Sequence, residues 1–293
     1  MRTTRHTDRG LTLAAGLAIG LYLVFLVLPL LLSLRSSLTN ENPLRGTSDF
    51  IGLRNYTELA GDERLRASVT FTLVLAAGVT VAANALGVGF ALLLNRTSLS
   101  YRVMRTLAFL PQVLSGVIVA FVWQTVLTQN GLLNNVLVRV GLLDEPFPWL
   151  GSPNAALISI GVVVTWVLSG FTTVVYLAAL QNIPLELHDM ASIDGVRGTQ
   201  RFRKVTWPMI APGTTISVTI SLITVLKLYD IIAVLTGGGP AESTQSTALY
   251  IVKLAFTSDR VGYASAAAMI LLALSALIAL TVTGFLRRRE VTL

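Results

Sequence analysis

The chain has 293 residues, of which 53% are hydrophobic and only 13% are charged, and its mean hydropathy is +0.71. This composition excludes an ordinary soluble globular domain, in which about a quarter of the residues are charged. The formal charge of +7 is explained by basic residues placed beside membrane spans, so it does not indicate nucleic-acid binding.

Long uncharged runs predict an all-α integral membrane protein with about six transmembrane helices, because each crossing needs about 20 apolar residues. In chain order, the predicted spans are residues 11–34, 67–94, 106–128, 155–180, 209–235 and 261–286. Arg2, Arg5 and Arg9 precede the first run, which is nevertheless too long for a signal peptide and lacks a small-residue cleavage pattern. Residues 1–293 are therefore expected to form a single transmembrane domain.

The basic residues predict which loops lie in the cytoplasm. Thirteen of the 22 Lys and Arg residues fall at the two termini and in the second and fourth loops between these spans. Since such residues are enriched on the cytoplasmic side, we expect a multi-pass protein of the cell membrane with both termini and segment 182–208 in the cytoplasm.

The first outer loop contains FIGLRNYTEL, an apolar and aromatic stretch within a charged segment. One interpretation is a loop that folds back onto the bilayer, with Phe50 and Tyr56 as anchors at the membrane surface. The other is a docking surface for an external partner. The sequence leaves both open.

A short helix is predicted within segment 182–208. Pro184 suits a first helical turn, and Glu186 and Asp189 favour the positive end of the helix dipole. The helix should end at Asp194 and Gly195, because glycine readily takes the left-handed cap conformation.

Leu187, Met190 and Ala191 follow helical spacing and predict an apolar stripe on this helix. The loop is too short to build a core of its own, so the stripe must be covered. It either packs on the cytoplasmic ends of the chain's own spans or enters a groove on a separate cytoplasmic protein.

The fifth predicted span contains Lys227 and Asp230, spaced to share one face of a continuous helix. Ionisable residues inside a membrane indicate a functional site. With Tyr229, they could line a solute pathway, serve an ion or proton relay in a secondary transporter, or simply neutralise each other.

Aromatic residues and one glycine in the third and fourth spans are further candidates for lining a pathway. These are Trp123, Trp166, Phe171, Tyr176 and Gly170. For each aromatic residue the simpler interpretation is packing, and Gly170 suits close approach of two helices.

The segment DMASIDGVRGTQRFRKVTWP resembles the EAA loop of ABC importer permeases. Asp189, Met190 and Ala191 stand at Glu-Ala-Ala, Gly195 stands at the glycine, and Pro208 ends the motif, with Val205 and Trp207 at the remaining positions. The chain departs from the pattern at Asp189, Met190, Val205 and Trp207. FIGLRNYTEL, LPQVLSGVIVAFVWQ, LTGGGPAEST and AFTSDRVGYASAAAMIL resemble further segments of the carbohydrate-uptake permeases of maltose and glycerol-phosphate type, in the same order.

This resemblance implies a permease subunit of an ATP-driven sugar importer, whose short cytoplasmic helix is a coupling helix. The coupling residues would be Glu186, Leu187, Asp189, Met190, Ala191, Asp194, Gly195 and Pro208. The implied partners are a second permease, two cytoplasmic ATPase subunits, an external solute-binding protein, the carbohydrate and membrane lipids. LTGGGP is typical of one of two different permeases, which implies a heterodimer.

The sequence agrees that ATP is handled by other subunits. None of Lys204, Lys227 and Lys253 follows a glycine, so the chain has no phosphate-binding loop, and ATP and Mg²⁺ are expected on the ATPases. With no cysteine and only two histidines, neither a metal site, a cofactor nor a catalytic constellation is expected. A membrane-embedded enzyme is therefore disfavoured.

Overall fold

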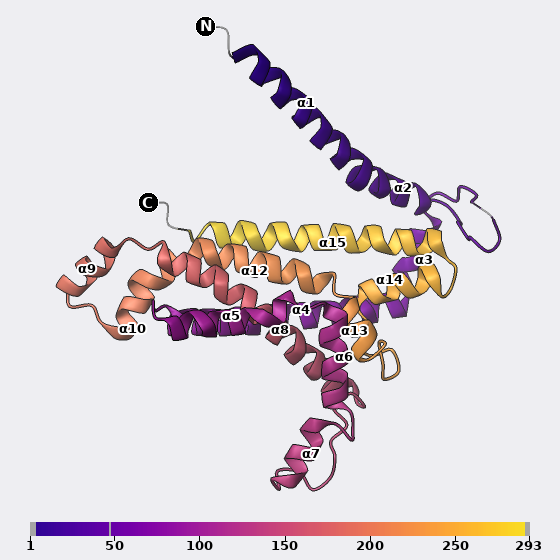
Figure 1. The fold of residues 1–293 in the computed structure, drawn as a ribbon. Coiled ribbons are helices and arrows are strands. Elements are labelled where there is room, and N and C mark those ends of the chain that lie inside the picture. Colours follow the sequence, from indigo (N-terminus) through magenta and orange to yellow (C-terminus); the bar gives the residue numbers. More distant parts are fainter. Residues whose placement is uncertain (1–3, 47, 291–293) are drawn as a thin grey trace. The chain divides into compact units, whose positions relative to one another are not determined.

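The computed structural model describes residues 4–46 and 48–290, which form helices joined by loops (Figure 1). The described chain divides into two compact units, Met1–Asp62 with Ile251–Leu272, and Glu63–Tyr250 with Ala273–Leu293. This architecture confirms the predicted all-helical membrane fold.

The first unit begins with a long apolar helix. The helical elements of this part of the chain are α1 (Thr4–Tyr22), the π-helical turn η1 (Leu23–Val27), α2 (Leu28–Ser36) and α3 (Arg54–Ala60). Helices α14 (Thr247–Phe256) and α15 (Val261–Arg287) each contribute residues to both units.

The second unit contains the other helices. They are α4 (Glu63–Leu94), α5 (Leu99–Val113), α6 (Gly116–Leu127), α7 (Leu132–Arg139), α8 (Pro153–Gln181), α9 (Leu185–Ile193), α10 (Gly198–Arg201), η2 (Phe202–Thr206), α11 (Trp207–Met209), α12 (Ala211–Leu226) and α13 (Asp230–Leu235). Within the described chain, five helices are long and apolar enough to cross a membrane, or six if the pair Gly198–Met209 and Ala211–Leu226, bent by 66°, is one span.

Two of the predicted spans are not continuous helices. The third is interrupted at Leu114 and Ser115, whose ψ angles of 145° and 136° are extended. Pro111 lies in the preceding turn, where its missing N–H weakens the helix. The fifth is interrupted between Leu226 and Asp230, so the prediction of one helix over 209–235 is wrong.

Helix α8 packs along α4 through buried polar contacts. Thr172 Oγ1 donates to the Ala83 carbonyl at 2.8 Å, and Tyr176 Oη donates to Asn84 Oδ1 at 2.9 Å. A β-carbon at Gly87 would overlap the Thr172 side chain, so the two helices approach as closely as glycine permits. This contact anchors a larger apolar core that α6, α12 and α13 complete.

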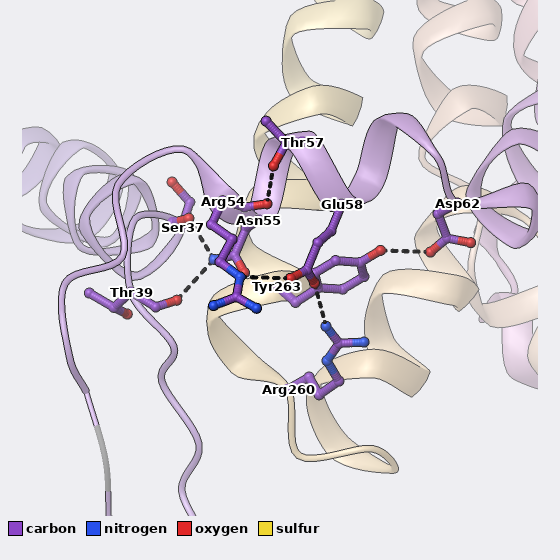
Figure 2. Close-up of polar contacts among 9 residues, drawn as sticks. All are labelled: Ser37, Thr39, Arg54, Asn55, Thr57, Glu58, Asp62, Arg260 and Tyr263. Carbon is purple, nitrogen blue, oxygen red and sulfur yellow. Dashed lines mark hydrogen bonds and ion pairs between the residues drawn. The ribbon is translucent and has the colours of Figure 1, made fainter.

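In the first unit, the loop between α2 and α3 is held by a buried asparagine. Asn55, 4% exposed, donates from Nδ2 to the carbonyls of Ser37 and Thr39 at 2.8 and 2.9 Å (Figure 2). These carbonyls follow the last turn of α2, where helical partners run out. The bonds fix the end of α2 against α3.

The start of α15 joins the same cluster (Figure 2). Glu58 on α3 receives hydrogen bonds from Arg54 and Arg260, both at 3.1 Å. Tyr263 Oη donates to Asp62 at 2.8 Å. The Arg260 guanidinium lies 4.0 Å from the centre of the Tyr263 ring. Polar side chains therefore crosslink the end of α2, helix α3 and the start of α15.

Candidate functional site

Helix α9 lies where the short cytoplasmic helix was predicted, over Leu185–Ile193 with Pro184 as its N-cap residue. Glu186 is in its first turn, near the positive end of the dipole. The helix stops at Asp194, and Gly195 has a φ of 71°, a left-handed conformation that glycine adopts without strain.

The predicted apolar stripe on α9 is covered only in part by the chain itself. Ala191 is 5% exposed and Leu187 packs against a small core that contains Tyr176 and Ile210. Met190, by contrast, is 61% exposed. Leu187 and Ala191 therefore attach α9 to its own chain, whereas Met190, which lines a common hollow with both of them, stays largely uncovered.

The exposed face of α9 also carries two apolar residues that sequence reasoning did not select. Leu185 and Ile193 are 78% and 85% exposed, and Glu186 and Asp189 are exposed beside them. Ile193 lies three residues after Met190, so the helical spacing could have identified it. The chain itself therefore leaves this mixed acidic and apolar surface uncovered.

A hollow of about 450 Å³ lies between α9 and the segment that leads to α12. Its walls include Met190 and Asp194 from α9, and Lys204 and Pro208 from the returning chain. Four of the EAA-like positions, Met190, Ala191, Val205 and Pro208, thus line one concave surface, although the motif spans 20 residues. Among the described residues, no group of three or more His, Cys, Asp and Glu could hold a metal ion.

The Lys227 and Asp230 side chains lie at the break between α12 and α13. Lys227 is the C-cap residue of α12, Tyr229 is the N-cap residue of α13, and Asp230 begins α13. The expectation that the two charges share a helix face is thus wrong, because the helix ends between them. Lys227 and Tyr229 are exposed, Asp230 is half-buried, and in the described part of the chain neither charged side chain has an ion pair or hydrogen bond.

The other pathway candidates lie on α6 and α8. Trp123 on α6 and Trp166 on α8 meet edge to face, with ring centres 5.7 Å apart. Phe171 is half-buried on α8. A β-carbon at Gly170 would collide with the backbone of Ala108 and Phe109 on α5, which assigns Gly170 to helix packing.

Comparisons with known proteins identify the relatives of the chain. Residues 83–291 match a family model described as "Binding-protein-dependent transport system inner membrane component". The probable starch degradation products permease AmyD of Thermoanaerobacterium thermosulfurigenes is 30% identical over 92% of this chain and 91% of its own length. The trehalose/maltose permease MalF of Thermococcus litoralis is 34% identical over 78% of this chain and 77% of its own.

The fold also matches a solved structure. A bacterial ABC transporter that imports the acidic polysaccharide alginate contains a chain with a TM-score of 0.83 and 26% identity to this one. The match covers 98% of this chain and 99% of that chain.

Proposed function

Because the chain belongs to the family of binding-protein-dependent transport system inner membrane components, we propose that it is a transmembrane permease subunit of an ATP-driven carbohydrate importer. Relatives named for maltose, lactose, starch products and multiple sugars support this solute class. Family membership favours this function over an ion- or proton-coupled secondary transporter.

The proposal includes four kinds of partner. A second permease completes the solute pathway, two cytoplasmic ATPase subunits bind ATP and Mg²⁺, and an external binding protein delivers the carbohydrate. A related importer has been solved with its alginate-bound periplasmic protein, which supports the last of these. Both termini and segment 182–208 lie in the cytoplasm in this arrangement.

The observation that carries the proposal is the exposed face of α9. Met190 and Ile193 are exposed beside Glu186 and Asp189, and exposed apolar side chains on a fixed helix suit a groove on another protein. We propose that this face docks on an ATPase subunit. Closure of the ATPases would then move the spans to which Leu187 and Ala191 attach α9.

The helix break in the fifth span supports a solute pathway at Lys227 and Tyr229. Discontinuous helices in transporters place backbone polar groups and side chains where they can meet solute. Both side chains are exposed at the break, so we propose that they contact sugar hydroxyls in the assembled transporter.

The chain has no cysteine, which permits a direct test of the docking face. A benzophenone maleimide attached to Met190→Cys or Ile193→Cys should crosslink to the co-expressed ATPase on illumination. Leu187→Cys is the matched control, because its side chain packs on the permease itself. If positions 190 and 193 gave no more crosslinked product than position 187, docking through this face would be contradicted.

A further inference from the structure

The breaks in the third and fifth spans lie next to each other. Helix α6 begins at Gly116 and α13 begins at Asp230, and the carboxylate of Asp230 lies directly on Gly116. At the other end of the pair, Gln124 Nε2 donates to the Val234 carbonyl at 3.0 Å. The two helices therefore run side by side in the same direction, with their first turns together (Figure 1).

The contact at Gly116 leaves no room for a larger residue. A β-carbon built there would overlap Oδ2 and Cγ of Asp230. Gly116 also stands at the first position of α6, where backbone N–H groups lack helical partners and carry partial positive charge. A carboxylate in this place is attracted to the start of α6 while belonging to α13.

Asp230 is not engaged by the other charge of the break. Its side chain forms no ion pair with Lys227 among the described residues, and the turn between α12 and α13 separates the two positions. The Asp230 side chain is half-buried, whereas Lys227 and Tyr229 are exposed. The three residues thus divide into one that packs and two that face outward.

We infer that Asp230 is a positioning residue, whose carboxylate rests on Gly116 and holds the first turns of α6 and α13 together so that Lys227 and Tyr229 have a fixed placement. The importance of this role for transport depends on the proposed solute pathway. The contact itself does not depend on that pathway.

The test is a double-mutant cycle read by the reactivity of one introduced cysteine. In a Lys227→Cys background, the complete transporter in membranes is treated with a charged methanethiosulfonate reagent. Gly116→Ala should change the labelling rate by on the order of tenfold, because the added methyl displaces Asp230. Once Asp230→Ala has made room, adding Gly116→Ala should cause no further change.

Two variants control for general damage. Gly89→Ala adds a methyl to α4 where no atom lies within 4 Å and should leave the labelling rate unchanged. Asp230→Asn preserves the shape of the side chain and should change the labelling rate less than Asp230→Ala does. The inference would be overturned if Gly116→Ala and Asp230→Ala changed the labelling rate independently of each other. It would also be overturned if Gly116→Ala had the same labelling rate as Gly89→Ala.

Melting temperatures of the purified complex, measured for the same single and double variants, separate this inference from the pathway proposal. If the cysteine introduced at position 227 is inaccessible to the reagent and Lys227→Ala leaves transport unchanged, the pathway proposal fails. Coupling between positions 116 and 230 in the melting temperature would still support the positioning contact, and additive shifts there would contradict it.

Discussion

Helices α3 and α9, two of the short helices outside the candidate spans, place their side chains in opposite environments. On α3, Asn55 is buried and Glu58 binds two arginines of the same unit. On α9, Met190 and Ile193 remain exposed. A helix that closes its polar contacts within its own chain acts as a scaffold, whereas one that exposes apolar side chains beside a defined turn is ready for a partner.

Among the substitutions that test this difference between α3 and α9, Gly195→Glu should have the largest effect on uptake. Gly195 has a φ of 71°, a conformation that costs other residues about 1–2 kcal/mol, and the new carboxylate would lie beside Asp194 at the end of α9. We expect uptake of the solute to be abolished while the protein stays in the membrane, as measured by transport and immunoblotting.

Asparagine provides the matched substitution, because it tolerates the left-handed conformation. Gly195→Asn should therefore retain most uptake. Normal transport by Gly195→Glu would show that this turn does not serve coupling.

Ile193→Asp should have the next largest effect. The side chain is 85% exposed, so the change should not affect the melting temperature of the isolated permease, but a charge in an apolar docking groove should reduce uptake on the order of tenfold. Ile193→Val should behave like the parent protein. A lower melting temperature with unchanged uptake would indicate that Ile193 supports the fold instead.

Asn55→Ala should have the smallest effect on transport and should act on stability. Two carbonyls would lose their partner, which costs about 1–3 kcal/mol, and the outer loop should be cleaved faster in limited proteolysis of proteoliposomes. Asn42→Ala removes a half-buried side chain that accepts from Leu44 and Arg45 of the same turn, so its cleavage rate should change less. Equal rates for the two variants would contradict the scaffold role of α3.

Much of the fold follows from patterns within the sequence. Apolar length predicted the helical membrane architecture, and the Asp194-Gly195 pair predicted the end of α9, because both features depend on neighbouring residues only. The EAA-like spacing and the order of the other segments led to the family, which the comparisons confirm.

The interruptions of the third and fifth spans could not be predicted from apolar length. The fifth span breaks after Leu226, where residues 214–236 contain no proline or glycine to mark the interruption. The same holds for α9, where periodicity grouped Leu187, Met190 and Ala191, but contact with the core selects two of them. In FIGLRNYTEL, the sequence pattern grouped Phe50 and Tyr56, but the fold separates them. Tyr56 Oη lies 2.8 Å from Ser37 Oγ and is held by the chain, whereas Phe50 is 75% exposed.

The glycine contacts of α8 also limit how the length of this helix can change in related chains. Gly87 of α4 meets Thr172 of α8, and Gly170 of α8 meets the backbone of α5. Inserting one residue into α8 before these positions would turn the rest of the helix by about 100° and misalign both interfaces at once. Insertions and deletions should therefore accumulate in the loops on either side of α8, while its own length stays constant.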